Sequence, residues 1–311
     1  MTEIVSKHNQ QIRKINFQGL EIGSEGINDS FLSSKPVFAL EINIFDFDAS
    51  SHIVKDYYRE KGKREKEKET FHPFILSPLH LINLAQDSDC DILALKFNLP
   101  DTEIDDNIIR AKALLKELLP HIKKPLLIRG ANNKNIDVKL LPELMKVLDR
   151  EVIIAFAQES TYKEIVPAVI KGGHILVIRT PIDINLAKEM NILTSDMGLN
   201  LDKILIDTDM GGLGYGIEYG YSIMERIKLA ALNEKNGGDK MLNMPLIAFA
   251  GEEALKAKET KSDTFSKSFG DFKERSIMYE ITTASAIIAA GANLVVLGHP
   301  DSLKTLKELL N

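Results

Sequence analysis

The chain has 311 residues but only one cysteine and no tryptophan. A disulfide needs two cysteines and an iron–sulfur cluster needs about four thiolates, so Cys90 cannot supply either within this chain. Any such cluster must be bound by another chain. Cys90 lies just before an apolar run, and we interpret its thiol as a small buried side chain instead of a nucleophile.

The spacings of metal sites and hydrolase nucleophiles are also missing. No HxxxH or CxxC pattern occurs, and no GxSxG elbow is present. The histidines are isolated from one another along the chain: His8, His52, His72, His80, His121, His174 and His299. The sequence therefore predicts no dedicated zinc site. It supports binding more clearly than catalysis.

The chain has fewer basic than acidic residues, and it has no long apolar run. The net charge is -6 and the isoelectric point is near 5.7, which argues against a nucleic-acid or anionic-membrane surface. No segment approaches the roughly 20 apolar residues of a membrane helix, and residues 1–14 do not form a signal peptide. We expect a cytoplasmic protein with no nucleic-acid or membrane partner.

What the chain does contain is a 44% share of hydrophobic residues. These gather into eight short runs that are rich in β-branched residues. The runs span residues 37–44, 92–97, 125–128, 152–156, 175–178, 204–206, 246–249 and 293–297. Strands that are apolar on both faces are typical of a parallel sheet.

Segments with helical periodicity lie between these runs, at residues 108–119, 140–148, 162–170, 184–190 and 282–290. Eight strand–helix repeats in one domain predict an α/β fold, a (β/α)8 TIM barrel. An open doubly wound sheet shows the same alternation, but it usually has fewer strands and an early GxGxxG, which is missing here. We expect a barrel over residues 36–311, preceded by an arm or hairpin over residues 1–35, where residues 14–17 and 20–22 alternate between apolar and polar.

One stretch, residues 207–232, combines a strand end, a glycine-rich turn and a helix. Asp207 and Asp209 follow the apolar run, and four glycines between 211 and 216 allow close approach of the backbone to a ligand. If the strand continued to Asp209, the two carboxylates would point to opposite faces. The helix has apolar residues at helical spacing, among them Leu229. This arrangement favours the rim of a binding pocket.

Polar side chains also close nearly every apolar run. They are Asn43, Asp46, Asn98, Arg129, Asn132, Gln158, Glu159, Arg179, Thr180, Asp207, Asp209, Glu252 and His299. Any one of them could simply mark the exit of a strand from the core, and His299 could be a general base or a capping residue. Taken together, they predict a polar cup at the carboxyl ends of the strands. Its amides and arginines are hydrogen-bond donors, so it would suit a ligand rich in carbonyls, amides or carboxylates.

Two stretches have the composition of insertions. Residues 59–69 are nearly all charged and should form a solvated helix or loop. Residues 256–275 form a polar segment after the seventh run, and their length suggests a lid or an interface.

The motifs resemble one known family. They cover residues 36–41, 91–96, 212–219, 221–226, 239–245, 251–254, 280–284, 290–292 and 299–300. Together they closely resemble the delta-subunit family of the acetyl-CoA decarbonylase/synthase complex, which includes the small subunit of the corrinoid iron–sulfur protein. The chain departs from the family pattern at Thr208, where proline is frequent, and at Gly298, where arginine is common.

This resemblance implies a TIM barrel that pairs with a large corrinoid iron–sulfur protein subunit. The large subunit would carry the 4Fe-4S cluster, and a cobalamin-type corrinoid would be shared between the two chains. The pair would take a methyl group from methyltetrahydrofolate through a methyltetrahydrofolate:corrinoid methyltransferase and pass it to acetyl-CoA synthase in the reductive acetyl-CoA (Wood–Ljungdahl) pathway. No Asp-x-His-x-x-Gly pattern is present, so the chain would cap the corrinoid without ligating its metal.

The residues assigned to the corrinoid lie at the predicted barrel mouth: Asn98, Arg129, Arg179, Asp207, Met210, Gly211, Gly212, Leu213, Gly214 and Tyr215. Two other functions stay open. A pterin-dependent methyltransferase barrel would bind methyltetrahydrofolate itself, and also lines its mouth with Asn and Asp. A metal-assisted lyase is a further alternative, which the scarcity of ligand clusters disfavours.

Overall fold

The computed structural model describes residues 12–23, 35–66, 76–233 and 238–310. Eight parallel strands close into a barrel in the order β10-β3-β4-β5-β6-β7-β8-β9. Their bounds are β3 Val37–Asn43, β4 Ile92–Lys96, β5 Leu126–Arg129, β6 Ile153–Ala157, β7 Ile175–Arg179, β8 Ile204–Asp207, β9 Leu246–Ala248 and β10 Leu294–Leu297. Each of the eight apolar runs forms one strand, so the predicted TIM barrel is confirmed.

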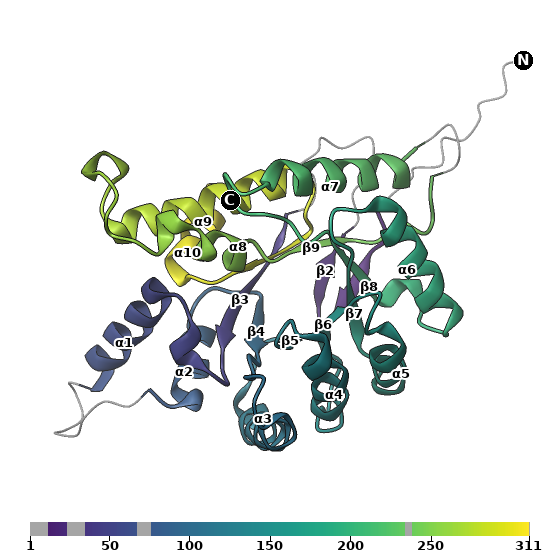
Figure 1. Ribbon diagram of the computed structural model, residues 1–311, viewed down its shortest axis with the longest axis horizontal. Coiled ribbons are helices and arrows are strands. Elements are labelled where there is room, and N and C mark those ends of the chain that lie inside the picture. The colour runs from purple at the N-terminus through teal and green to yellow at the C-terminus, as the bar shows by residue number, and fades with distance from the viewer. Residues whose placement is uncertain (1–11, 24–34, 67–75, 234–237, 311) are drawn as a thin grey trace, which may run out of the picture.

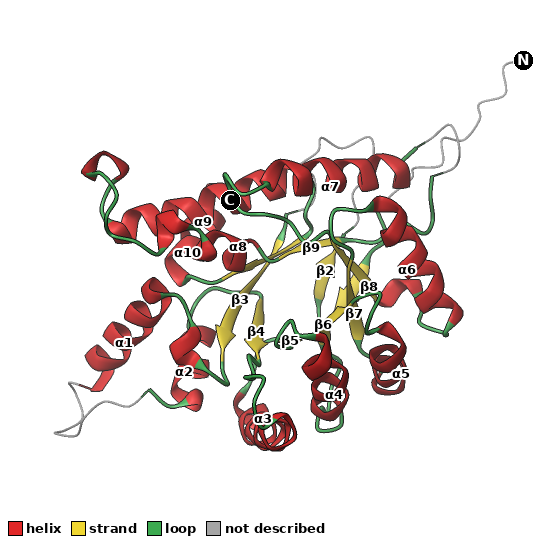
Figure 2. Ribbon diagram, in the orientation of Figure 1, coloured by secondary structure: helices red, strands yellow, loops and turns green. Residues whose placement is uncertain are grey.

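Helices surround the barrel, as Figures 1 and 2 show. They are α1 His52–Lys66, α2 Pro78–Gln86, α3 Ile104–Leu118, α4 Lys134–Met145, α5 Tyr162–Gly172, α6 Ile184–Asp196, α7 Ile217–Ala231, α8 Ala250–Lys256, α9 Phe272–Ala289 and α10 Pro300–Leu310. The charged segment that begins at residue 59 continues helix α1 as far as Lys66, and residues 67–69 lie outside the described residues. No helix in the described ranges is both long and apolar enough to cross a membrane.

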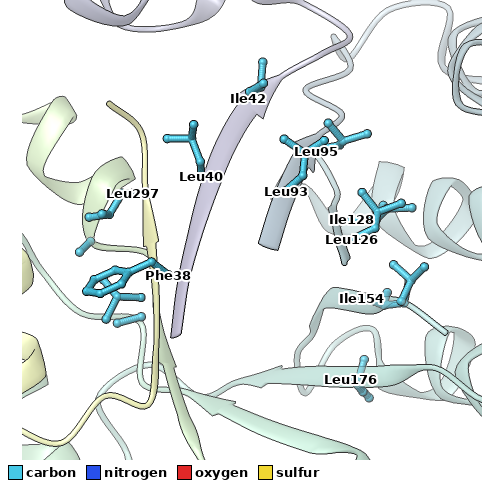
Figure 3. Packing of buried hydrophobic residues seen from close by; sticks show 14 of the residues in the cluster. Phe38, Leu40, Ile42, Leu93, Leu95, Leu126, Ile128, Ile154, Leu176 and Leu297 are labelled. Atoms are coloured by element: carbon cyan, nitrogen blue, oxygen red, sulfur yellow. The ribbon is translucent and has the colours of Figure 1, made fainter. Parts of the chain in front are cut away.

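The alternation of side chains along each strand builds two separate cores. Phe38, Leu40 and Ile42 of β3 point outward and belong to the larger cluster, which the helices cover; Figure 3 shows them beside matching residues of the neighbouring strands. Val37 and Ala39 belong to the second cluster, which fills the inside of the barrel. The barrel is therefore a packed core and not a pore.

A small hairpin, β1 Ile15–Phe17 and β2 Leu20–Ile22, precedes the barrel, where the sequence alternation predicted one. Phe17 and Ile22 are fully buried and join the inner cluster. The side-chain amide of Gln18 donates to the carbonyl of Glu151, at the start of β6. The hairpin therefore covers the amino-terminal end of the barrel and leaves the carboxyl-terminal end to the site. The domain boundary at residue 36 stays a prediction.

Two details of the helices differ from the sequence prediction. Leu229 was placed on the buried face of α7 but is 65% exposed, because it lies two residues, or about 200° around the helix, from the buried Ile227. Helix α9 starts at Phe272, ten residues before the predicted start. The polar segment before it is fixed in place by Arg275, whose guanidinium donates to the carbonyls of Glu259 at 2.8 Å and Ser262 at 2.6 Å.

Candidate functional site

Charged residues occupy inward-facing positions near the carboxyl ends of five strands, above the apolar interior of the barrel. They are Glu41, Lys96, Arg129, Arg179 and Asp207. Strand register aligns them, since Lys96 pairs with Arg129 and Arg179 pairs with Asp207 across adjacent strands. The carboxyl end of the barrel therefore contains a ring of ionic side chains, which we call the mouth cluster together with Glu252 of α8.

Arg129 lies at the centre of the mouth cluster and is fully buried. Its Nη1 contacts both carboxylate oxygens of Glu41, at 3.1 and 2.9 Å, and its Nη2 contacts Glu252. Lys96 Nζ lies 3.1 Å from the other oxygen of Glu252. Because the two carboxylates face three cationic contacts at close range, their charges are compensated inside the barrel.

A second ionic group is built on Arg179, which is 4% exposed. Its Nε donates to Asp207 at 2.6 Å, and its Nη1 lies 3.0 Å from Asp209. The strand ends at Asp207, and the backbone turns at Asp209 with a φ of 51°. The condition for the two carboxylates to point to opposite faces is therefore not met, and both contact one guanidinium.

Two aromatic rings complete this layer. The guanidinium carbon of Arg179 lies 3.6 Å from the ring centre of Phe156, and that of Arg129 lies 4.6 Å from the ring centre of Phe249. A bulge in β6 between Ala155 and Ala157 allows Phe156 to join the inner cluster beside Ala155. Arginine faces stacked on rings at this depth close the centre of the mouth.

The charges shift the pKa values of the cluster. Burial alone would raise the pKa of Glu41, but the positive charges of Arg129 and Lys96 outweigh burial and hold it below its ordinary value. Burial, followed by the charge of Arg129, lowers the pKa of Lys96 to about 8. Glu41 is therefore ionised near neutral pH and is a poor proton acceptor.

The glycine-rich turn between β8 and α7 lies against α8 and α9. A Cβ on Gly212 would meet the carbonyl oxygen of Glu253 at 2.9 Å, so the turn approaches α8 more closely than a side chain would permit. The Tyr279 hydroxyl donates to the carbonyl of Leu213. The Tyr215 hydroxyl lies 3.2 Å from Glu259, and its ring is 52% exposed. The turn therefore forms one raised wall of the mouth.

The predicted contact residues thus fall into three groups, and Gly212, which lies against α8, is buried like Met210. Arg129, Arg179 and Asp207 form the floor of the mouth, and the arginines donate to carboxylates of this chain, contrary to the expectation of free donors. Met210 is 3% exposed and packs under α7, so it belongs to the core. Those that reach the surface, at least in part, are Asn98, Gly211, Leu213, Gly214 and Tyr215. As contacts to a ligand, all ten stay predictions.

His299 at the end of β10 is fully buried. Its Nδ1 accepts a hydrogen bond from the backbone N–H of Asp301 at 3.1 Å, and its ring packs edge-on against Tyr57. Burial lowers its pKa to about 4. Of the two roles considered for His299, the structure supports the capping residue and disfavours the general base.

The sequence reasoning missed several of these residues. Glu41 and Lys96 lie within strands and not after them, and the available signal was a charge at an inward position of an apolar run. Glu280 on α9 was also missed; it is fully buried and accepts a hydrogen bond from the backbone N–H of Gly298 at 2.6 Å. Phe156 could not be placed because the bulge has no clear sequence signature.

Beside the mouth cluster, a cavity of about 350 Å³ opens between the ends of β3, β4 and β10, the start of α1 and helix α8. Three lysines line it: Lys96, Lys256 and Lys261. Elsewhere on this end of the barrel, four residues other than glycine have positive φ angles, namely Glu103 (49°), Asn132 (60°), Ile182 (49°) and Asp209 (51°). Such strain gathers at binding sites, and a β-branched residue adopts it rarely. The carboxyl end of the barrel is therefore the candidate site.

Over the described ranges, no group of three or more His, Cys, Asp or Glu side chains is arranged to hold a metal ion. Cys90 is buried as predicted, and its Sγ faces the carbonyl of Ala85. What the mouth offers a ligand is amide, hydroxyl and backbone chemistry above a compensated ionic floor.

Relatives in sequence were found in one family. The family described as CO dehydrogenase/acetyl-CoA synthase delta subunit matches residues 77–297. The delta subunit of the acetyl-CoA decarbonylase/synthase complex from Methanocaldococcus jannaschii is 30% identical over 222 residues, or 70% of this chain and 53% of that protein. The subunit of the same name from Methanopyrus kandleri is 28% identical over 66% of this chain and 50% of its own length. The chain spans about half the length of the curated relatives it matches.

Similar solved structures are dihydropteroate synthases. The enzyme from Xanthomonas albilineans superposes with a TM-score of 0.58 at 10% identity, covering 96% of this chain and 97% of that chain. The enzyme from Thermus thermophilus gives 0.55 at 11% identity, with the same coverage. At these identities the likeness shows the fold alone, a TIM barrel.

Proposed function

This chain belongs to the CO dehydrogenase/acetyl-CoA synthase delta-subunit family, and from that premise we propose that it is the small subunit of a corrinoid iron–sulfur methyl carrier. In this proposal a larger subunit holds the 4Fe-4S cluster, and the corrinoid lies between the two chains. The barrel mouth of this chain covers one face of the corrinoid. The pair carries methyl groups from methyltetrahydrofolate to acetyl-CoA synthase.

The residues at the mouth fit such a ligand. A corrin ring is fringed by amides, and Asn98, Asn132 and Gln158 offer amide side chains that are at least partly exposed around the opening. The wall formed by Leu213, Gly214 and Tyr215 adds backbone groups and an exposed ring beside them. Neutral amides bind one another without the charge that a phosphate or folate glutamate would require, so this donor set suits the corrinoid.

The observation that carries the proposal is the filled floor of the mouth. Arg129 and Arg179, stacked on Phe249 and Phe156 and paired with carboxylates, fill the centre of the mouth and leave a flat pterin no deep slot there. A flat cofactor that lies across the mouth does not need a deep slot at its centre. This favours a covering role over the alternative of a methyltransferase that binds methyltetrahydrofolate itself.

When bound, the corrinoid supplies the cobalt chemistry by which a methyl group is accepted and released. The residues of this chain orient it through the amide rim and the glycine-rich turn. The mouth cluster gives a rigid, charge-compensated floor, which excludes water from the covered face. Opening of the subunit interface would then admit the methyltransferase or acetyl-CoA synthase.

Gly212 provides a test of the covering role. Gly212→Ala should displace the turn from Glu253 and reduce the corrinoid retained by the two-subunit complex by more than half, measured by absorption after gel filtration under anaerobic conditions. The matched control is Gly198→Ala, at a glycine with a φ of 98° and nothing within 4 Å of the added Cβ. It should cost roughly 1–3 kcal/mol of strain but leave retention unchanged. Full retention by Gly212→Ala would exclude the turn from the corrinoid site.

A further inference from the structure

The cavity beside the mouth cluster contains more basic than acidic groups once its ion pairs are counted. Its lining includes Lys96, Lys256 and Lys261 on one side and Glu41 and Glu252 on the other. Both carboxylates are already bound by Arg129, which lies beneath them and is fully buried. With Glu253, which also pairs with Lys256, the group contains four cations and three anions.

The cations differ in how firmly they are engaged. Lys96 contacts Glu252 at 3.1 Å, and Lys256 is shared between Glu252 at 3.2 Å and Glu253 at 2.8 Å. No hydrogen bond or ion pair joins the ammonium group of Lys261 to a described residue. It lines the cavity, so its charge is available to a ligand there.

Two residues that line the same space carry neutral donors. Ser50 and Ser51 line the cavity, and the hydroxyl oxygens of both are buried without a hydrogen-bond partner. Buried hydroxyls without partners are uncommon and call for an explanation. Ser51 directly precedes α1, a helix of 15 residues, and the first turn of a helix presents N–H groups that have no partner within the helix.

From this geometry we propose that the cavity is a binding site for a tetrahedral oxyanion, a phosphate or the phosphoryl group of a larger ligand. Lys261 and Lys256 supply the charge, and the hydroxyls of Ser50 and Ser51 and the start of α1 supply the directed donors. The carboxyl ends of the last strands of TIM barrels are frequent phosphate sites, for the same physical reason of converging donors. The site is separate from the amide rim and does not depend on the proposed corrinoid.

Calorimetric titration of the full corrinoid-free chain with inorganic phosphate tests the proposal. We expect saturable binding of one phosphate per chain, weakened about ten- to hundredfold by Lys261→Gln and by Ser51→Ala, as for loss of one hydrogen bond to a charged group. Lys171→Gln, which removes an exposed lysine of α5 far along the barrel, is the matched control and should leave the affinity unchanged. A parallel titration with glycerol 3-phosphate distinguishes the source, because tighter binding of the ester indicates a phosphorylated ligand and tighter binding of phosphate indicates the free ion.

No binding of either compound by the wild-type chain at tens of millimolar would overturn the proposal. Equal weakening by Lys261→Gln and Lys171→Gln would also overturn it, because general charge attraction would then be the cause. Thermal unfolding of each variant identifies any that is misfolded. These outcomes are independent of corrinoid retention, so the oxyanion site and the proposed function can fail separately.

Discussion

Replacing Arg129 by methionine is expected to lower the free energy of unfolding by about 3–5 kcal/mol, the usual cost of leaving buried charges without their partner. Glu41 and Glu252 have side chains that are only 13% and 10% exposed, and each would lose its contact with the guanidinium. Methionine keeps most of the volume between Phe156 and Phe249, so the loss would be chiefly electrostatic. Urea denaturation followed by circular dichroism measures it.

The matched control removes the charges together. In Arg129→Met combined with Glu41→Gln and Glu252→Gln, no unpaired carboxylate is left in the mouth cluster. Removing Arg129 together with its two carboxylates leaves neither anion unpaired. Lys96 keeps its charge and loses its contact with Glu252, so part of the lost stability should return. If Arg129→Met alone unfolds at the same urea concentration as the wild type, the ion pairs of Arg129 do not stabilise the fold.

The second large effect concerns Glu280, whose burial raises its pKa from 4.5 to about 7. Between these values the folded protein binds more protons than the unfolded chain, so the free energy of unfolding falls as pH rises through that window. Ionisation of this carboxyl should therefore cost about 3 kcal/mol at pH 8 and nothing near pH 4. Glu280→Gln stays neutral and can still accept from Gly298.

We therefore expect Glu280→Gln to match the wild type near pH 4 and to be more stable by about 3 kcal/mol at pH 8. Denaturant titrations at the two pH values measure both quantities. Glu117→Gln, at an exposed carboxyl of α3, is the control and should change stability little at either pH. If Glu280→Gln is destabilised equally at the two pH values, the carboxyl contributes through packing, and its ionisation does not destabilise the folded protein.

The architecture could be predicted because its signals are local. Each apolar run of the sequence became a barrel strand, since a strand buried on both faces needs a short continuous apolar segment. The alternation at residues 14–17 and 20–22 likewise predicted the hairpin, although the role of Phe17 and Ile22 in covering the barrel depends on contacts distant in sequence.

The site could be predicted only in part. Asp207 and Arg179 were identified as strand-end residues, but their pairing depends on the register of β7 and β8. Glu41 was missed because its charge lies inside an apolar strand. Its ion-pair partner, Arg129, lies on a strand two places away, and the sequence does not reveal that contact. Leu229 was misplaced because helical periodicity identifies the buried face of a helix only approximately. It lies two residues after the buried Ile227, on the other side of α7.

The covering role itself is tested most directly by anaerobic purification of this chain from its native host. Mass spectrometry would identify any partner, and ultraviolet–visible absorption would detect a corrinoid. The proposal predicts a stoichiometric, larger, cysteine-bearing subunit whose presence brings the corrinoid bands. A colourless chain that purifies alone and binds methyltetrahydrofolate would contradict the proposal and support the pterin-dependent methyltransferase.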